Sequence, residues 1–550
     1  MLEALSGRRT LLALAVGASA VLVYLNALPA QFVLDDFPAV VNNPGAHWPL
    51  DWQGILFTNY WGSPEHYQSL TIYRPLATLS FALSDWAGAA GNAAAHRLIN
   101  VALHAGCSVL VFYLTWFLLV PVKTSTGPGG EYHPVWLKGG AATIAGLLFA
   151  LHPVHTEAVV GVVNRAELLA AFFVLLGALG LLRLRRGRMW LLPLLYGLAL
   201  LSKENGATLW SVCIAYHLAA YASERFGGTL RLRRRDLMLH IGFAVVLGAY
   251  LLLRSNAVDG LLAGELSAAD NPMVGAGFLA RCLTPFKVFA EYLRLQIAPA
   301  GLTIDYSLNH LPAATTLVDL QAWLGMLSVI GILGLLYLAV RHNYFALVFA
   351  ILAFFGTYVV VSNTLFLSTI IMAERLIYLP SAFFLISVVI AGGSVTVFAG
   401  PRLRKALAVG TVSVTLLFAA GTYVRNNDWL TPLSLFRTAV EAAPNSAKSR
   451  HLLGNELASQ GLLAEALYEL DAGAAIDPGN FVLRTNTARV LAQLGRYDEA
   501  LRHLESALTS APGYRAAFEL VCAIYERTGQ PRAAGRHCFR RNGAAAKSAP

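Results

Sequence analysis

Two adjacent carboxylates, Asp35 and Asp36, follow the first long apolar segment and are the residues best placed to act as a base. A carboxyl group that is partly shielded from water holds a raised pKa and then accepts a proton near neutral pH. Two acids at a membrane boundary also occur as a solvated loop, which is the alternative interpretation. The other motifs must decide between the two.

Further charged residues stand where later apolar segments begin or end. They are Arg74, Arg165, Lys203, Glu204, Asp305, Glu374 and Arg375. Charges in a short break between membrane helices usually line a cavity rather than face lipid, and an arginine fork matches a pair of phosphate oxygens. Structural ion pairs, or a surface pair within the Glu-Arg dipeptide, are the alternatives. We expect the four cations of this set to bind phosphate, with Glu204 in the same cavity.

His152, His155 and Glu157 lie within six residues of one another, a composition that suits a metal or a polar ligand. The spacing differs from the i, i+4 pair of histidines on a zinc-enzyme helix, and Pro153 interrupts the helical face. Hydrogen bonding to a hydroxylated or phosphorylated ligand is therefore the preferred interpretation, with helix-end capping as the alternative. We predict no metal and no other cofactor, although a divalent metal stays an open alternative.

The elements that must position these residues are membrane helices. Of 550 residues, 56% are hydrophobic and only 13% charged, and the mean hydropathy is +0.57, which excludes an ordinary soluble protein. The net charge of +10 comes from basic runs between apolar segments, at 183–188, 231–235 and 402–405. Such runs indicate membrane topology, so nucleic acid is not an expected partner.

Apolar segments long enough to cross a bilayer recur along the first 425 residues. They lie near 10–28, 97–120, 137–153, 166–183, 189–202, 206–221, 237–253, 321–340, 344–362, 376–398 and 404–424. With the basic runs and the N-terminus in the cytoplasm, an odd number of crossings places the C-terminal part outside, in the periplasm of a bacterium. We interpret 280–298 as re-entrant or interfacial, because a crossing there would place Arg341 outside. The first segment is expected to be an uncleaved span rather than a signal peptide.

The C-terminal 125 or so residues carry a repeat of 34 residues. The period joins Gly461, Gly495 and Gly529, then Ala466, Ala500 and Ala534, then Pro444, Pro478 and Pro512. Glycine at a tight turn, alanine at a helix crossing and proline after the second helix are typical of tetratricopeptide repeats. We therefore predict a domain at 1–425 and a solenoid of about three repeats at 426–550, with a groove for an extended peptide or another partner.

The cysteines fall into two groups. Cys107, Cys213 and Cys282 lie in or beside apolar segments and are expected in the core. Cys522 and Cys538 fall on the two helices of the third repeat. Outside the cytoplasm they would form a disulfide, and two buried thiols are the alternative.

The ordered motifs together resemble the transmembrane and tetratricopeptide-repeat O-mannosyltransferases and their bacterial relatives. The segments that carry the resemblance are FVLDDFPAVVNNP at 32–44, YRPLATLSF at 73–81, HRLINVALHA at 96–105, LHPVHTEAVVGVVNRAELL at 151–169, LSKENG at 201–206 and AERLIYLP at 373–380. The resemblance implies the GT-C glycosyltransferase fold, an acidic motif in the first external loop and a polyprenyl-phosphate sugar as donor. The chain has fewer repeats than the animal members, so their choice of acceptor is not carried over.

These implications suit the chemistry of the residues. Asp35, or failing that Asp36, would take the proton of an acceptor hydroxyl, which we expect to belong to a protein serine or threonine, and the anomeric carbon would be inverted in one displacement. The four cations would stabilise the departing lipid phosphate. His152, His155 and Glu157 would orient the sugar or the phosphate. A non-catalytic membrane scaffold that uses its repeats, and a carrier of lipid-linked sugars, are the rival interpretations.

Overall fold

The computed structural model describes residues 2–62, 72–119, 135–223, 234–258, 266–307 and 310–530. Every regular element in these ranges is a helix. The chain divides into one compact unit of Met1–Leu302 with Ala313–Thr431 and a second of Thr303–Pro312 with Pro432–Pro550. The predicted all-α fold, with a membrane helix bundle and helical repeats, is confirmed. The functional domains proposed for 1–425 and 426–550 stay a prediction.

A helix lies over each expected apolar segment. These helices are α1 (Leu2–Val23), α4 (Ala93–Leu118), α5 (Val135–Ala150), α7 (Arg165–Arg183), α8 (Leu191–Ser202), α9 (Thr208–Ala222), α10 (Arg234–Ala257), α12 (Leu320–Arg341), α13 (Phe345–Tyr358), α14 (Tyr378–Phe398) and α15 (Pro401–Asp428). Seven described helices are long and apolar enough to cross a membrane, and α5 forms a further candidate with α6 (Thr156–Val160) across a bend of 48°. The number of crossings stays a prediction.

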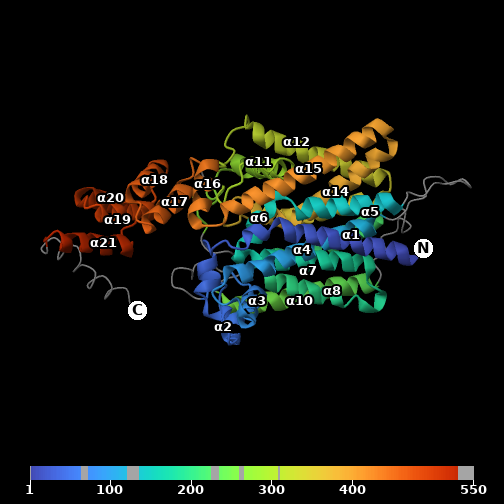
Figure 1. The fold of residues 1–550 in the computed structure, drawn as a ribbon, viewed down its shortest axis with the longest axis horizontal. Coiled ribbons are helices and arrows are strands. Elements are labelled where there is room, and N and C mark those ends of the chain that lie inside the picture. Colours follow the sequence, from blue (N-terminus) through green and yellow to red (C-terminus); the bar gives the residue numbers. More distant parts are fainter. Residues whose placement is uncertain are drawn as a thin grey trace, which may run out of the picture. The chain divides into compact units, whose positions relative to one another are not determined.

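The first unit is built around α4, which packs against α1, α5 and α7 (Figure 1). Gly146 lets α5 approach α1 closely, because a Cβ at this position would lie 2.9 Å from the Val16 side chain. In the most apolar stretches of the spans that contain α7 and α14, 67% of the residues are buried inside the protein, whereas in those of α12 and α15 only 11% are buried. The exposed apolar faces of α12 and α15 are typical of helices that contact lipid.

Amide side chains join the first membrane helix to the last. Asn426 donates a hydrogen bond to Asn26 Oδ1 at 2.8 Å, and Asn26 donates to the carbonyl oxygen of Tyr423 at 2.9 Å. One step further along, the backbone N–H of Gln31 donates to the carbonyl of Leu430 at 3.0 Å. The chain that leaves α1 is thereby fixed to the end of α15.

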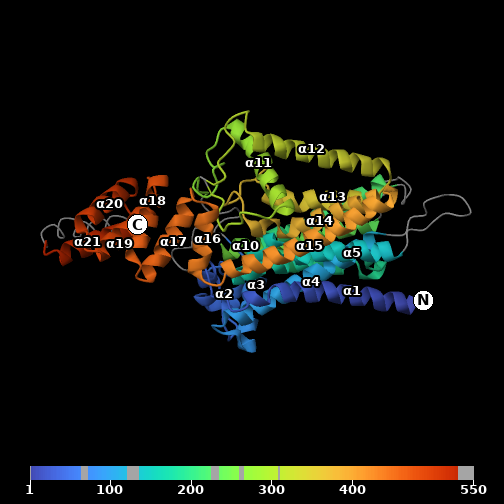
Figure 2. The ribbon, with the colours of Figure 1, turned by 45° about the horizontal axis from the view of Figure 1, so that its top comes forward.

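The segment expected to be re-entrant or interfacial forms α11 (Phe278–Ile297), with Pro285 inside it. This helix is not among the described helices that are apolar enough to cross a membrane. It packs against α12, which is followed by α13 and α14 (Figure 2). The re-entrant or interfacial placement stays a prediction.

The second unit repeats one helical hairpin. Its helices are α16 (Pro432–Ala442), α17 (Ala447–Ser459), α18 (Leu463–Ile476), α19 (Phe481–Gln493), α20 (Tyr497–Ser510) and α21 (Arg515–Arg527). Gly461, Gly495 and Gly529 have φ of +79°, +77° and +72°, the left-handed conformation that favours glycine after a helix. Ala466 and Ala500 are completely buried at the helix crossings. The predicted period is confirmed over 444–530, whereas Ala534 lies outside the described residues.

The described cysteines differ in their environment. Cys107 and Cys213 are free and buried, as expected, whereas Cys282 is exposed on α11, so the prediction that it lies in the core is wrong. Cys522 is disulfide-bonded, in agreement with the oxidised alternative. Its predicted partner Cys538 lies outside the described residues, as do residues 231–233 of one basic run.

Candidate active site

Asp36 is completely buried in the loop that follows α1. Its Oδ2 accepts the N–H of Val33 at 3.1 Å, and its Oδ1 accepts the N–H of Val163 at 2.7 Å. Burial raises the pKa of Asp36 to about 6, although these two N–H groups and the charge of Arg97 act in the opposite direction. One carboxylate oxygen therefore closes the loop on itself, and the other joins the loop to the segment before α7.

Asp35 has a different environment from its neighbour. The side chain is exposed, and the preceding Leu34 has φ of +48°, a left-handed conformation that is strained for a residue with a branched side chain. Among the described residues, none donates a hydrogen bond to the Asp35 carboxylate. The charge of Asp35 acts on Arg375 and on Tyr60, so these groups lie near it. Asp35 is the carboxylate that remains available for chemistry.

Arg375 brings a cation to this loop from the start of the segment that leads into α14. Its Nη1 pairs with Glu157 Oε1, and its backbone N–H donates to Glu157 Oε2 at 2.8 Å. The Glu157 side chain is 3% exposed, whereas the Arg375 side chain is 28% exposed. The glutamate thus holds the arginine while part of the guanidinium faces outward.

Two further cations come from α3 (Pro75–Ser84) and from the break between α8 and α9. Arg74, which precedes α3, donates from Nε and Nη2 to Glu204 Oε2 at 3.2 and 3.1 Å, and its guanidinium lies 5.1 Å from the ring centre of Tyr60. Lys203 pairs with Glu167 of α7. The structure therefore confirms structural ion pairs at both positions without excluding a ligand.

The three cations converge although they are far apart in the sequence. Lys203 lies within electrostatic range of both Arg74 and Arg375, and Asp35 acts on Arg375. The Asp35 carboxylate, which accepts no hydrogen bond from the described residues, thus lies near a group of three cations. Each of these cations is paired with a glutamate. A phosphate group next to a weak base would suit such an arrangement. The catalytic and binding roles of these residues stay predictions.

Arg165 lies inside the bundle. It donates to Asn100 Oδ1 at 3.0 Å, to Ser84 Oγ at 2.7 Å, and to the carbonyl oxygens of Ser80 and His96 at 3.1 and 2.9 Å. The side chain is completely buried. Its donors are thus directed at protein acceptors, and this geometry favours a role in holding α3, α4 and α7 together.

The two histidines of the predicted site are also completely buried. His152 donates from Nε2 to the carbonyl of Gln296 at 3.1 Å and accepts the N–H of Val154 at 3.3 Å. His155 Nδ1 lies 2.9 Å from the carbonyl oxygen of Phe149, and its Nε2 lies 2.8 Å from Ser381 Oγ. Because each ring nitrogen has a protein partner, packing and capping account for both residues. Their role in orienting a sugar or phosphate stays a prediction.

The remaining charged residues of the sequence set lie elsewhere. Asp305 belongs to the second unit, where its Oδ2 accepts hydrogen bonds from Ser446 Oγ at 2.5 Å and Ser307 Oγ at 2.7 Å. Glu374 is completely buried and lies 3.6 Å from Arg425 Nη2. Asp305 thus joins a loop to the start of the repeats, and Glu374 pairs with the last membrane helix rather than with its neighbour.

Sequence reasoning missed Arg97, which positions the acidic loop. Its guanidinium donates to the carbonyl oxygens of Leu28 at 3.1 Å, Ala30 at 2.7 Å, Gln31 at 3.1 Å and Val160 at 2.8 Å. The signal was present, because an arginine near the start of an apolar helix must find acceptors inside the protein. Its acceptors are backbone carbonyls, which no side-chain pattern reveals.

Comparison with known proteins finds relatives that match most of the chain. Human protein O-mannosyl-transferase TMTC1 is 30% identical over 507 residues, which cover 85% of this chain and 55% of the relative. Protein O-mannosyl-transferase F38B6.6 of Caenorhabditis elegans is 29% identical over 463 residues, with 83% and 61% covered. The resemblance to the transmembrane and tetratricopeptide-repeat O-mannosyltransferases is confirmed. The chain spans little more than half the length of these relatives.

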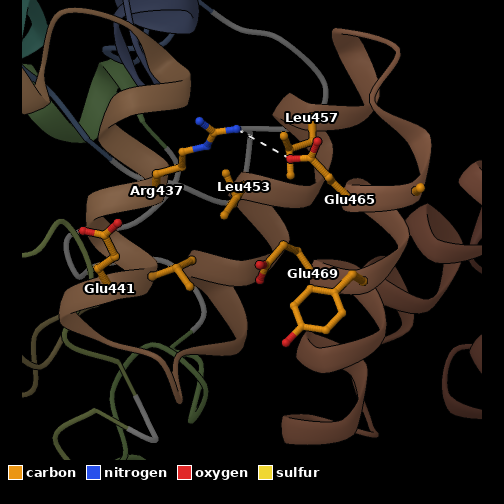
Figure 3. Close-up of a pocket in the computed structure, with 9 residues that line it drawn as sticks. Arg437, Glu441, Leu453, Leu457, Glu465 and Glu469 are labelled. Carbon is orange, nitrogen blue, oxygen red and sulfur yellow. Dashed lines mark ion pairs between the residues drawn. The ribbon is translucent and has the colours of Figure 1, made fainter.

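The tetratricopeptide repeat family matches residues 457–524, within the second unit. A pocket lies in this unit between α16, α17 and α18, with Leu453 and Leu457 on its wall (Figure 3). Arg437 and Glu465 face each other across it at 3.6 Å. An apolar wall with charges of both signs is suited to a polypeptide.

Proposed function

We propose that this chain is a membrane glycosyltransferase that moves a sugar from a polyprenyl-phosphate donor to a protein hydroxyl on the extracytoplasmic face. Mannose is the sugar that the names of the relatives suggest. The observation that carries the proposal is the exposed Asp35 near Arg375, together with Lys203 and Arg74. A base and a set of cations are what this reaction requires.

Asp35 is the proposed base. Its carboxylate accepts the proton of the acceptor hydroxyl while the oxygen attacks the anomeric carbon of the sugar. The bond between that carbon and the phosphate oxygen breaks, and the lipid phosphate leaves with the electron pair. The attack and the departure occur on opposite faces of the carbon, so its configuration inverts. Asp36, with both oxygens bound to backbone N–H groups, is proposed to hold the loop.

Arg375, Lys203 and Arg74 are proposed to stabilise the charge that develops on the departing phosphate. Their partners Glu157, Glu167 and Glu204 keep them in place before the donor binds. Arg375 is the most exposed of the three side chains and is the proposed direct contact. Arg165, His152 and His155 are assigned to positioning, because protein groups occupy their polar atoms.

The second unit is proposed to hold the acceptor protein or peptide, since tetratricopeptide repeats form grooves for extended chains. A transferase of this kind acts where lipid-linked sugars are presented, so we place the repeats outside the cytoplasm. The membrane bilayer supplies the donor, and no cofactor is proposed.

The test uses the purified full chain, a polyprenyl-phosphate mannose and an acceptor protein, with transfer measured by mass spectrometry. Asp35→Asn is expected to lower the rate at least about 100-fold and to leave donor binding unchanged. The matched control is Asp51→Asn, because Asp51 caps α2 (Trp52–Leu56) by accepting the N–H of Gly54 and asparagine caps equally well. Normal transfer by Asp35→Asn would reject Asp35 as the base, whereas no transfer by the folded wild type would reject the transferase and favour the scaffold or carrier interpretation.

A further inference from the structure

A second group of reactive side chains lies on α9 and α10, away from the candidate active site. Cys213 and His217 are four residues apart on α9, and Asp236 and His240 are four residues apart on α10. Residues with this spacing share one face of a helix. Ligand atoms of Cys213, His217 and His240 all lie within 4.8 Å of one another.

The hydrogen bonds and ion pairs around His217 suit a metal ligand. Its Nδ1 lies 3.9 Å from Cys213 Sγ, and its Nε2 lies 3.9 Å from Asp236 Oδ1. A proton on Nε2, on the side of the carboxylate, leaves the Nδ1 lone pair directed at the sulfur. A metal-binding histidine commonly has a carboxylate next to its second nitrogen, and this carboxylate fixes the tautomer.

Trp210 provides a reporter for the same group. Its indole N–H donates to His240 Nδ1 at 3.0 Å, and the two rings are stacked at 30°. A metal at Nδ1 takes the lone pair that the indole uses. A metal at Nε2 requires the ring proton on Nδ1, which then cannot accept from the indole. In both cases metal binding breaks the hydrogen bond of Trp210.

We propose that Cys213, His217 and His240 bind a zinc ion, with Asp236 as the carboxylate partner of His217. One thiolate and two imidazoles are ligands that zinc prefers, and three protein ligands leave the fourth position to water. On binding, the Cys213 thiol releases its proton to solvent and the sulfur forms the bond to the metal. The ion fastens α9 to α10.

The site is separate from the proposed reaction. His217 is nine residues beyond Thr208, the first residue of α9, or about 14 Å along the helix at ~1.5 Å per residue. The candidate active site lies before that first turn, at Lys203 and Glu204. The basic residues at the start of α10 place the zinc group on the side expected to face the cytoplasm, where a thiol stays reduced.

The test is metal binding by the full chain purified in detergent and stripped with a chelator. We expect one equivalent of zinc by elemental mass spectrometry after reloading, and a thiolate-to-cobalt absorption band with Co²⁺. Cys213→Ser should abolish the band, and His240→Gln should lower zinc affinity at least about tenfold. Cys107→Ser is the matched control, since Cys107 is also free and buried on a membrane helix.

Tryptophan fluorescence gives an independent readout. Zinc is expected to change the emission of the wild-type chain. The Trp210→Phe variant should still bind zinc but should lose most of this change in emission. Each variant must elute from a sizing column like the wild type. Failure of the folded wild type to bind zinc or cobalt, or equal binding by Cys213→Ser, would overturn the proposal.

Discussion

Two groups of charged residues differ in their exposure to solvent. We call Arg165 and Asp36, which are completely buried, the buried layer, and Asp35 and Arg375, which are exposed or partly exposed, the rim. Arg165 is completely buried and donates to four protein acceptors. Arg375 pairs with one glutamate and keeps 28% of its side chain exposed. An arginine with its donors satisfied inside the protein stabilises the fold, whereas one with an outward face can also bind a ligand. Partner count and exposure, rather than residue type, separate the two groups.

The largest effect is expected from breaking the buried layer. Arg165→Ala leaves acceptors on α3 and α4 without a donor, at a cost of about 3–5 kcal/mol in the free energy of unfolding. We expect a severe loss of folded protein, measured as yield and as unfolding in a denaturing detergent. Arg183→Ala on the same helix is the control, since Arg183 is exposed, and it should change stability by less than about 0.5 kcal/mol. Equal stability of the two variants would contradict the conclusion that the buried Arg165 stabilises the fold.

Substitution of a rim residue should lower the rate of sugar transfer and leave the fold intact. Arg375→Gln keeps a hydrogen-bond donor for Glu157 but removes the charge, so the folded protein should survive and sugar transfer should fall about 100-fold. The measurement is the rate of transfer at saturating donor, with Arg294→Gln on α11 as the control. An unchanged rate would remove Arg375 from the proposed phosphate site.

The pH dependence of stability tests the assignment of Asp36 to the buried layer. Its pKa of about 6 lies above the ordinary value of 3.8, so folding favours the protonated form. This contribution is present below about pH 4 and is lost as the pH rises through about 6, with a total of at most ~3 kcal/mol. Thermal unfolding of the wild type and of Asp36→Asn should show the difference.

In Asp36→Asn, the part of the pH dependence between about pH 4 and 6 should disappear. The variant should also lose about 1 kcal/mol at low pH, because the amide NH₂ cannot accept the second backbone N–H. Asp35→Asn is the matched control, as its side chain is exposed. Identical pH profiles for the wild type and Asp36→Asn would contradict a buried, proton-binding Asp36.

The smallest effect is expected when a buried hydrogen bond between two uncharged groups is removed. Thr422 on α15 donates from Oγ1 to the carbonyl of Leu151 at 2.7 Å. Thr422→Val keeps the shape and removes the donor, so we expect a loss of about 1 kcal/mol and unchanged transfer. Thr411→Val is the control, because Thr411 bonds to Leu407 in its own helix. A larger loss for Thr411→Val would show that helix propensity, not the bond between elements, sets the effect.

The fold was readable from the sequence to a greater extent than the site. Apolar length and a 34-residue period are local properties, and both lead directly to helices that the structure contains. The partners of ionisable groups are not local. His152 binds the carbonyl of Gln296, and His155 lies against Ser381. Since no spacing rule connects such positions, a buried histidine and a ligand-binding one have the same appearance in the sequence.

The set of charged residues predicted to stand at the ends of apolar segments includes residues that meet and one that does not join them. Arg74, Lys203 and Arg375 converge, as charges in breaks between membrane helices were expected to do. Asp305 instead bonds to Ser446 in the repeat unit. The apolar segments before these residues predict that each stands near a helix end, but they do not tell which helix ends meet.

The fixing of the chain after α1 to the end of α15 has a consequence for biosynthesis. Asp35 is made early, but Gln31, four residues before it, completes its backbone hydrogen bond only with Leu430. Asn26 likewise waits for Asn426. A ribosome must therefore deliver every intervening membrane helix before this contact forms, so a nascent chain that stops before α15 can make the Arg97 and Val163 contacts of the acidic loop but not the hydrogen bond to Leu430.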